Sequence, residues 1–151
     1  MLAERPPLEN VSIHTAFRTF GPLTIRKFVE VAACYNLPEP NFDPDVTKFV
    51  RRPFGVKGVC VGMVRVQGDE ECGILRWVGS QQDFLKEACV MKGFEVGLSR
   101  LIDETGLVTY TIFDSDYNEI EVKKFDKNGK LLSTKNSRRG IGQLRNTALI
   151  N

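Results

Sequence analysis

Histidine is almost absent from this sequence: His14 is the one histidine among 151 residues. Mechanisms that need two histidines are therefore excluded, and the usual zinc-ligand spacings are missing. His14 alternates with apolar residues and has no nucleophile motif beside it, which indicates a surface or packed histidine rather than a catalytic one. We expect no metal and no other cofactor.

Long apolar runs are missing as well. No stretch of the sequence approaches the roughly 18 apolar residues that a membrane helix needs. The first residues, Met-Leu-Ala-Glu-Arg-Pro-Pro, contain an acid and two prolines where a secretory signal would have an apolar run. We therefore expect a cytoplasmic protein with no membrane partner.

The sequence has few cysteines, and none of them are paired at short spacing. The four lie apart from one another, each inside an apolar pattern, at Cys34, Cys60, Cys72 and Cys89. Such isolated cysteines indicate buried free thiols, which suit a reducing compartment.

What the sequence does have is an ordinary globular composition with an uneven charge. Hydrophobic residues make up 42% and charged residues 26% of 151 residues, which predicts one globular domain. We place this domain, of the α+β class by its expected elements, at residues 1–134. Residues 69–121 carry 12 acidic and 4 basic side chains, whereas residues 122–151 carry 8 basic and 1 acidic. Because residues 135–151 are polar and basic without any period, they are expected to form a flexible tail.

Hydrophobic periodicity predicts both helices and strands. Helical spacing predicts helices over residues 23–35 and 80–93, and a short helical turn over 45–52. Alternating or β-branched patterns predict strands over residues 11–20, 56–66, 73–78, 94–101, 107–113, 117–125 and 130–134.

The order of these elements favours one fold over another. The first six main elements have the β-α-β-β-α-β order of a ferredoxin-like split β-α-β sheet, here extended by a C-terminal antiparallel meander. If the first strand is only an edge arm, the order becomes that of a cone-like curved sheet with helices and a cavity. Neither fold would by itself define a function.

An acidic turn needs a separate interpretation because it resembles the start of a calcium loop. Asp114, Asp116 and Asn118 have the expected spacing, but Glu119 stands at the sixth position instead of glycine, and Phe125 at the twelfth instead of glutamate. A hairpin turn rich in Asp and Asn accounts for these residues without a metal.

Two groups of basic residues are the candidate binding site. Lysine and arginine bind phosphates through a charge term that needs no base-specific contact. We therefore expect a non-enzymatic binding protein for a polyanion, nucleic acid first or else an acidic protein surface, if the fold brings both groups together. The groups are Lys48, Arg51, Arg52 and Lys57, and Lys135, Arg138, Arg139 and Arg145.

Arg76 supports an alternative function. A hairpin turn centred on Asp69 would place Arg76 opposite Gly62 on an apolar face, where a charge needs a partner. That partner is an internal carboxylate such as Glu87 or Glu95, or else an anionic ligand.

The second case predicts a small-ligand binder or an enzyme with a cavity near Arg76. A third hypothesis is a protein–protein interaction or inhibitor domain, with a homodimer formed along an exposed edge of the meander. Whether the protein is an enzyme stays open, with binding favoured.

Overall fold

The computed structural model describes residues 10–37, 47–54, 58–67, 70–79 and 83–137. Two helices precede one sheet of eight strands, in which each strand pairs antiparallel with the next along the chain. The helices are α1 (Val11–Phe20) and α2 (Ile25–Cys34). The strands are β1 (Thr47–Phe54), β2 (Gly58–Gln67), β3 (Glu70–Val78), β4 (Phe84–Met91), β5 (Phe94–Asp103), β6 (Val108–Phe113), β7 (Glu119–Phe125) and β8 (Leu131–Asn136).

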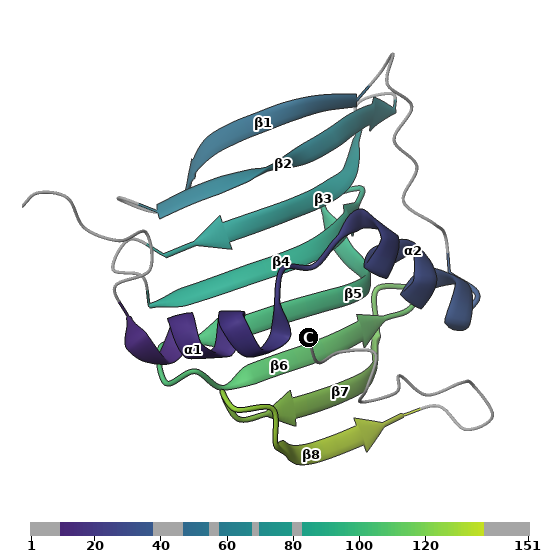
Figure 1. Cartoon of the computed structure of the whole chain (residues 1–151). Coiled ribbons are helices and arrows are strands. Elements are labelled where there is room, and N and C mark those ends of the chain that lie inside the picture. Colours follow the sequence, from purple (N-terminus) through teal and green to yellow (C-terminus); the bar gives the residue numbers. More distant parts are fainter. Residues whose placement is uncertain (1–9, 38–46, 55–57, 68–69, 80–82, 138–151) are drawn as a thin grey trace, which may run out of the picture.

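Both helices lie across the same face of the twisted sheet, with β1 at one edge and β8 at the other (Figure 1). We call the face beneath the helices the inner face and the opposite one the outer face. This arrangement confirms the α+β class. Within the described ranges, neither helix is long and apolar enough to cross a membrane.

The main core lies between the helices and the inner face. Its helical members include Ile13, Phe20 and Phe28, and the strands β4 to β7 supply most of the rest. A second, smaller cluster on the outer face consists of Cys60, Val64, Leu75 and Val90. The sheet is therefore apolar on both sides over β2 to β4, as the β-branched hairpin sequence indicates.

Residues 11–20 form α1, and the strand predicted there is wrong. Asn10 caps the helix, because its side-chain oxygen accepts a hydrogen bond from the Ile13 amide at 3.0 Å. Ile13 and Phe20 are buried two helical turns apart, whereas Val11 is 75% exposed. The apolar residues of this segment fit the helical period as well as the strand period, and packing against the sheet selects the helix.

The helix predicted over residues 23–35 is confirmed as α2. Thr24 caps the start of the helix, because its side chain accepts a hydrogen bond from the Lys27 amide at 3.2 Å. Phe28 and Ala32 are buried one turn apart and hold the helix on the sheet.

Two other predicted helices are strands. The short helical turn predicted at residues 45–52 is replaced by β1, which tolerates Pro53 because β1 is an edge strand. The helix predicted over residues 80–93 is replaced by β4. There, the apolar residues fit either period, and pairing with strands on both sides decides for the strand. Gly93 then lies in the β4–β5 turn, where Lys92 and Gly93 both have positive φ.

These changes remove the split β-α-β order. Among the described elements, both helices come first and no helix connects two strands, so the sheet is not the interleaved ferredoxin-like one. The C-terminal meander is confirmed, since β5 to β8 match the four strands predicted from residue 94 onward. Lys135, assigned to the tail, lies in β8 opposite Val122.

The β2–β3 hairpin is confirmed, but its register differs by one residue from the predicted one. Only residues 68–69 separate the paired Gln67 and Glu70, so the turn is centred half a residue earlier. Arg76 consequently faces Val61 instead of Gly62. A shift of one residue changes which side chains share a face, so Arg76 lies with Val61 and not with Gly62. This is the inner face, because Ile74 and Val78, on the same side of β3, pack against the main core.

Three hairpin loops of the meander share one geometry. Asp103, Asp114 and Asp126 begin these loops, and each carboxylate accepts hydrogen bonds of 2.9–3.1 Å from the amides two and four residues later. Tyr117 has a φ of 65° at the position where the other two loops have glycine. The turn interpretation of Asp114 is thus confirmed, and the described part of the chain contains no cluster of three metal-ligating side chains.

Candidate functional site

The structure does not bring the two predicted basic groups together. Lys48, Arg51 and Arg52 lie on β1 and Lys135 lies on β8, at opposite edges of the sheet. Arg51 and Arg52 also point to opposite faces, because neighbouring residues of a strand alternate. The remaining predicted residues, Lys57, Arg138, Arg139 and Arg145, lie outside the described residues.

A groove of about 530 Å³ lies on the outer face of the C-terminal strands. Lys124 of β7 and Lys135 of β8 line this groove, and Lys124 pairs with Ser133, two residues before Lys135. Glu119 is the one carboxylate among the lining residues that the structure describes. Thr109, Thr111 and Ser133 add hydroxyl groups on this face, whereas Thr134, also in the lining, pairs with Lys123 of the inner face.

On the inner face, a row of polar side chains crosses the sheet from strand to strand. Five directly paired positions on β3 to β7 carry Arg76, Glu87, Arg100, Tyr110 and Lys123. The last four of these residues are buried. We call this row the polar ladder. Buried ionisable groups are costly unless they are paired, so the ladder requires specific contacts.

Arg100 is the central residue of the ladder, and its side chain is fully buried. It donates hydrogen bonds to the Glu87 carboxylate at 2.5 Å and to the Gly21 carbonyl at 2.7 Å. It also approaches the Tyr110 hydroxyl at 3.3 Å. Burial raises the pKa of Tyr110, while the guanidinium of Arg100 opposes that shift. Because Gly21 joins the two helices, Arg100 ties their connection to the sheet.

Arg76 is the exposed end of the ladder. Its guanidinium donates to Glu87 at 3.0 Å, and 40% of its side chain is exposed. Glu87 was one of the two internal carboxylates predicted as its partner, and this pair is confirmed. Phe17 of α1 packs against both guanidinium groups, with 6.0 Å from its ring centre to Arg76 and 5.9 Å to Arg100.

A pocket of about 240 Å³ opens beside Arg76 on the inner face. Leu23 and Ile25 line it from the helical side, and Phe49, Val61 and Ile74 line it from the sheet. Among the described residues that line it, only Arg76 and Glu87 have polar side chains. The arrangement is an apolar pocket with a cationic group at its wall.

The other predicted partner of Arg76 lies elsewhere. Glu95 binds Lys86 at 2.8 Å on the outer face. There it lines a separate hollow of about 440 Å³ together with Arg52 and Trp77. Lys86 also lies 5.7 Å from the centre of the Trp77 ring. Arg52 and Arg76 therefore belong to different sites on different faces.

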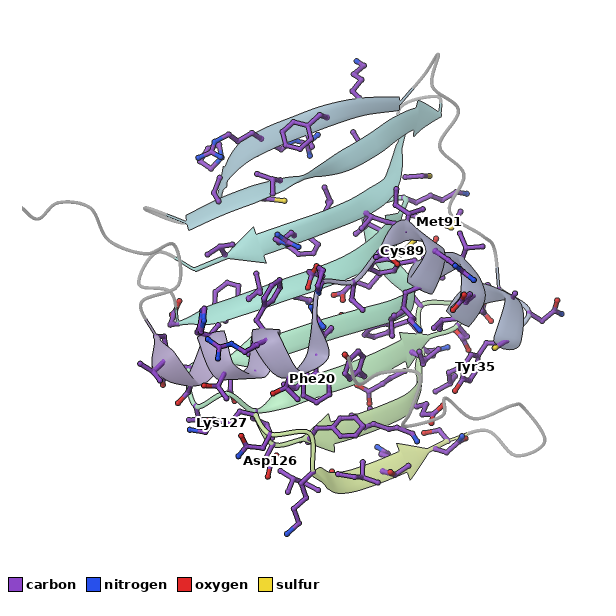
Figure 2. The ribbon with its side chains drawn as sticks, viewed as in Figure 1. Phe20, Tyr35, Cys89, Met91, Asp126 and Lys127 are labelled. Carbon is purple, nitrogen blue, oxygen red and sulfur yellow. The ribbon has the colours of Figure 1, made fainter. Side chains whose placement is uncertain are left out.

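A second buried polar contact supports α2. The Tyr35 hydroxyl donates a hydrogen bond to the Glu121 carboxylate of β7, and both side chains are buried. Figure 2 shows Tyr35 at the far end of α2 and Cys89 on β4.

Burial raises the pKa of the Cys89 thiol to about 12, and the neighbouring Cys72 adds to the shift.

The remaining candidates have structural explanations. His14 is exposed on α1 and lies 3.1 Å from an Arg18 nitrogen, which agrees with the surface histidine that the sequence indicates. All four cysteines are free, but only Cys60 and Cys89 are buried, whereas Cys34 is exposed. The expectation of buried thiols is therefore correct for two of the four.

The described residues form an α+β protein, in which two helices precede an eight-stranded antiparallel meander. No family model matches the chain, and no curated protein or solved structure is significantly similar to it.

Sequence reasoning missed Arg100 and Lys123 as members of a common row. A signal for them existed, because Glu87, Arg100 and Lys123 each interrupt an apolar pattern at a position that faces inward in the structure. Since residues 84–91 were assigned to a helix, this signal was not visible as a row across strands.

Proposed function

We propose that the protein is a non-enzymatic binding protein that engages a polyanion, nucleic acid first, through the outer face of β6 to β8. The observation that carries this proposal is the groove lined by Lys124, Lys135 and the hydroxyl groups of Thr109, Thr111 and Ser133. Lysine and hydroxyl side chains are common donors to phosphate oxygens, and they need no particular base sequence.

The distribution of charge supports the same surface. Lys127 and Lys130 lie in the β7–β8 loop beside the groove strands, and Lys130 is exposed. Arg138, Arg139 and Arg145 follow β8 in the sequence. The proposal therefore assigns polyanion binding to the β8 edge, and the β1 residues Lys48, Arg51 and Arg52 are not part of this surface.

The proposal also places the protein in the cytoplasm. The four free cysteines support this location, because thiols stay reduced there. An acidic protein surface is the other partner that the same lysines fit, and competition by polyglutamate distinguishes it from nucleic acid.

Fluorescence anisotropy with labelled single-stranded RNA and DNA at low salt tests the proposal. The double variant Lys124→Gln/Lys135→Gln should bind roughly tenfold more weakly, at about 0.7 kcal/mol for each exposed charge. The matched control is Lys48→Gln/Arg51→Gln, which removes the same charge from the opposite edge and should leave affinity unchanged.

Neutralising Arg138, Arg139 and Arg145 together should weaken binding further. The proposal fails if the full chain binds neither nucleic acid at low salt. It also fails if the two double variants lose affinity equally, because the groove would then have no special role.

A homodimer is a second candidate, and β8 is the observation that favours it. Among the described strands, β8 is the last of the sheet, and its Leu131 and Leu132 are 37% and 53% exposed. Edge strands of this kind pair with a second chain in many proteins. Light scattering at increasing concentration decides the matter, since a strict monomer excludes it.

A further inference from the structure

We infer that the inner face carries a second binding site, in which Arg76 holds the head group of a small aliphatic monocarboxylate. The site goes beyond polyanion binding and rests on different residues, on the other face of the sheet. Its parts are the exposed end of the polar ladder and the apolar pocket beside it, which agrees with the cavity of the curved-sheet alternative.

The charges of the ladder leave Arg76 incompletely neutralised. Glu87 is shared between two guanidinium groups, so one carboxylate serves two cations. Arg100 is fully buried, whereas Arg76 has 40% of its side chain exposed. A ligand carboxylate on Arg76 would extend the row to alternating charges, namely ligand, Arg76, Glu87 and Arg100, with two of each sign.

Arg76 also has donors to offer. A guanidinium carries five N–H groups, and within the described ranges Arg76 makes one hydrogen bond, to Glu87. Arginine binds carboxylates through two parallel hydrogen bonds, which fixes the orientation of the head group. Because Glu87 keeps Arg100 as a partner, it stays paired when Arg76 turns towards a ligand.

The walls of the pocket select the rest of the ligand. Leu23, Ile25, Val61 and Ile74 are aliphatic, and the volume of about 240 Å³ is slightly below that of pockets for drug-sized molecules. A short hydrocarbon tail fits such walls. A phosphate or a dicarboxylate fits less well, because Arg76 is the one cation among the described residues of the lining and Glu87 repels an additional negative charge.

Isothermal titration calorimetry with straight-chain carboxylates, from butanoate to decanoate, tests the site. Affinity should rise about fourfold with each added methylene group until the pocket is full, and then stay level. Octanoate methyl ester, which has the tail without the charge, should bind at least tenfold more weakly than octanoate.

Arg76→Met should remove octanoate binding while the melting temperature stays close to that of the parent protein. The matched control is Lys130→Met, which removes an exposed cation from the β7–β8 loop and should bind octanoate normally. If Arg76→Met unfolds, Val61→Phe fills the pocket while Arg76, Glu87 and Arg100 all stay in the chain, and it should also remove binding.

The inference is overturned if no carboxylate of the series binds at millimolar concentration. It is equally overturned if the ester binds as well as the acid, or if folded Arg76→Met or Val61→Phe still binds octanoate. The groove variant Lys124→Gln/Lys135→Gln should keep octanoate binding, so failure of one site is distinguishable from failure of the other.

Discussion

Arg100 shows what a fully buried charge requires of its neighbours. Its guanidinium is held by a carboxylate, a backbone carbonyl and a tyrosine hydroxyl that come from three separate parts of the chain. Removing such a residue leaves Glu87 buried with only the partly exposed Arg76 beside it. The two arginines of the ladder should therefore differ in their effect on stability.

Arg100→Met should lower the free energy of unfolding by about 3–5 kcal/mol, because it breaks a buried ion pair from one side. Arg76→Met should cost about 1 kcal/mol or less, since Glu87 keeps Arg100 and the lost pair is partly exposed. Urea denaturation of both variants measures the difference. Equal losses would show that the ladder is not organised around Arg100.

The four thiols should react in an order set by their burial. Cys34 is exposed and should react quickly with a disulfide reagent at pH 8. Cys89, whose pKa is raised to about 12, stays protonated and should react only after denaturation. Single Cys→Ser variants assign each kinetic phase, and fast reaction of Cys89 in the folded protein would contradict its burial beneath α2.

At the scale of single residues, the sequence predicted contacts correctly where a residue is unusual in its own strand. The need of Arg76 for an internal carboxylate was predictable, because a charge interrupts a β-branched run. The contacts of Arg100 with Gly21 and Tyr110 were not, because they depend on how α1 and α2 cross the sheet.

At the scale of elements, the hairpin loops of the meander are the most regular feature. Hydrogen bonds from the Lys130 amide, and then from Asn128, lower the pKa of Asp126 from its ordinary value of 3.8, although burial opposes the shift. Asp126 and Lys127 lie at the β7–β8 turn in Figure 2, where the Lys127 carbonyl accepts a hydrogen bond from Thr19 of α1 at 2.8 Å. The loop thus links the meander to α1.

The lowered pKa predicts how this loop responds to acid. The stability that the Asp126 carboxylate contributes should be fully present above pH 3.8 and lost as the pH falls through the lower folded-state pKa. The difference in melting temperature between the parent and Asp126→Ala should therefore shrink at low pH. Asp126→Asn keeps an acceptor oxygen without titrating, and its own contribution should be independent of pH. If the difference in melting temperature between the parent and Asp126→Ala grew as the pH fell, the stabilising role of the Asp126 carboxylate would be refuted.

The sequence predicted elements well where turn residues mark both ends of a strand. The strands β5 to β8 are separated by loops that begin with aspartate and contain glycine or asparagine, and all four strands were predicted. The prediction from the sequence was wrong for α1 and β4, because their apolar residues fit the helical and the strand period equally. In both cases the neighbours in space decide, through Asn10 and the inner face for α1 and through β3 and β5 for β4.

At the scale of the whole molecule, the order of strands determines which sites can cooperate. With neighbouring strands about 4.8 Å apart, seven spacings place β1 roughly 34 Å from β8. The basic residues of these two strands therefore act as separate groups. Their separation was not predictable, because the sequence favoured a helix that would have brought the chain back across the sheet.

The salt dependence of nucleic-acid binding tests the proposed groove most directly. For single strands, each neutralised phosphate contributes about 0.7 to the slope of log affinity against log salt concentration. Lys124→Gln/Lys135→Gln should reduce that slope by about 1.4, whereas Lys48→Gln/Arg51→Gln should leave it unchanged. An unchanged slope for the groove variant, with a reduced slope for the β1 variant, would contradict the account.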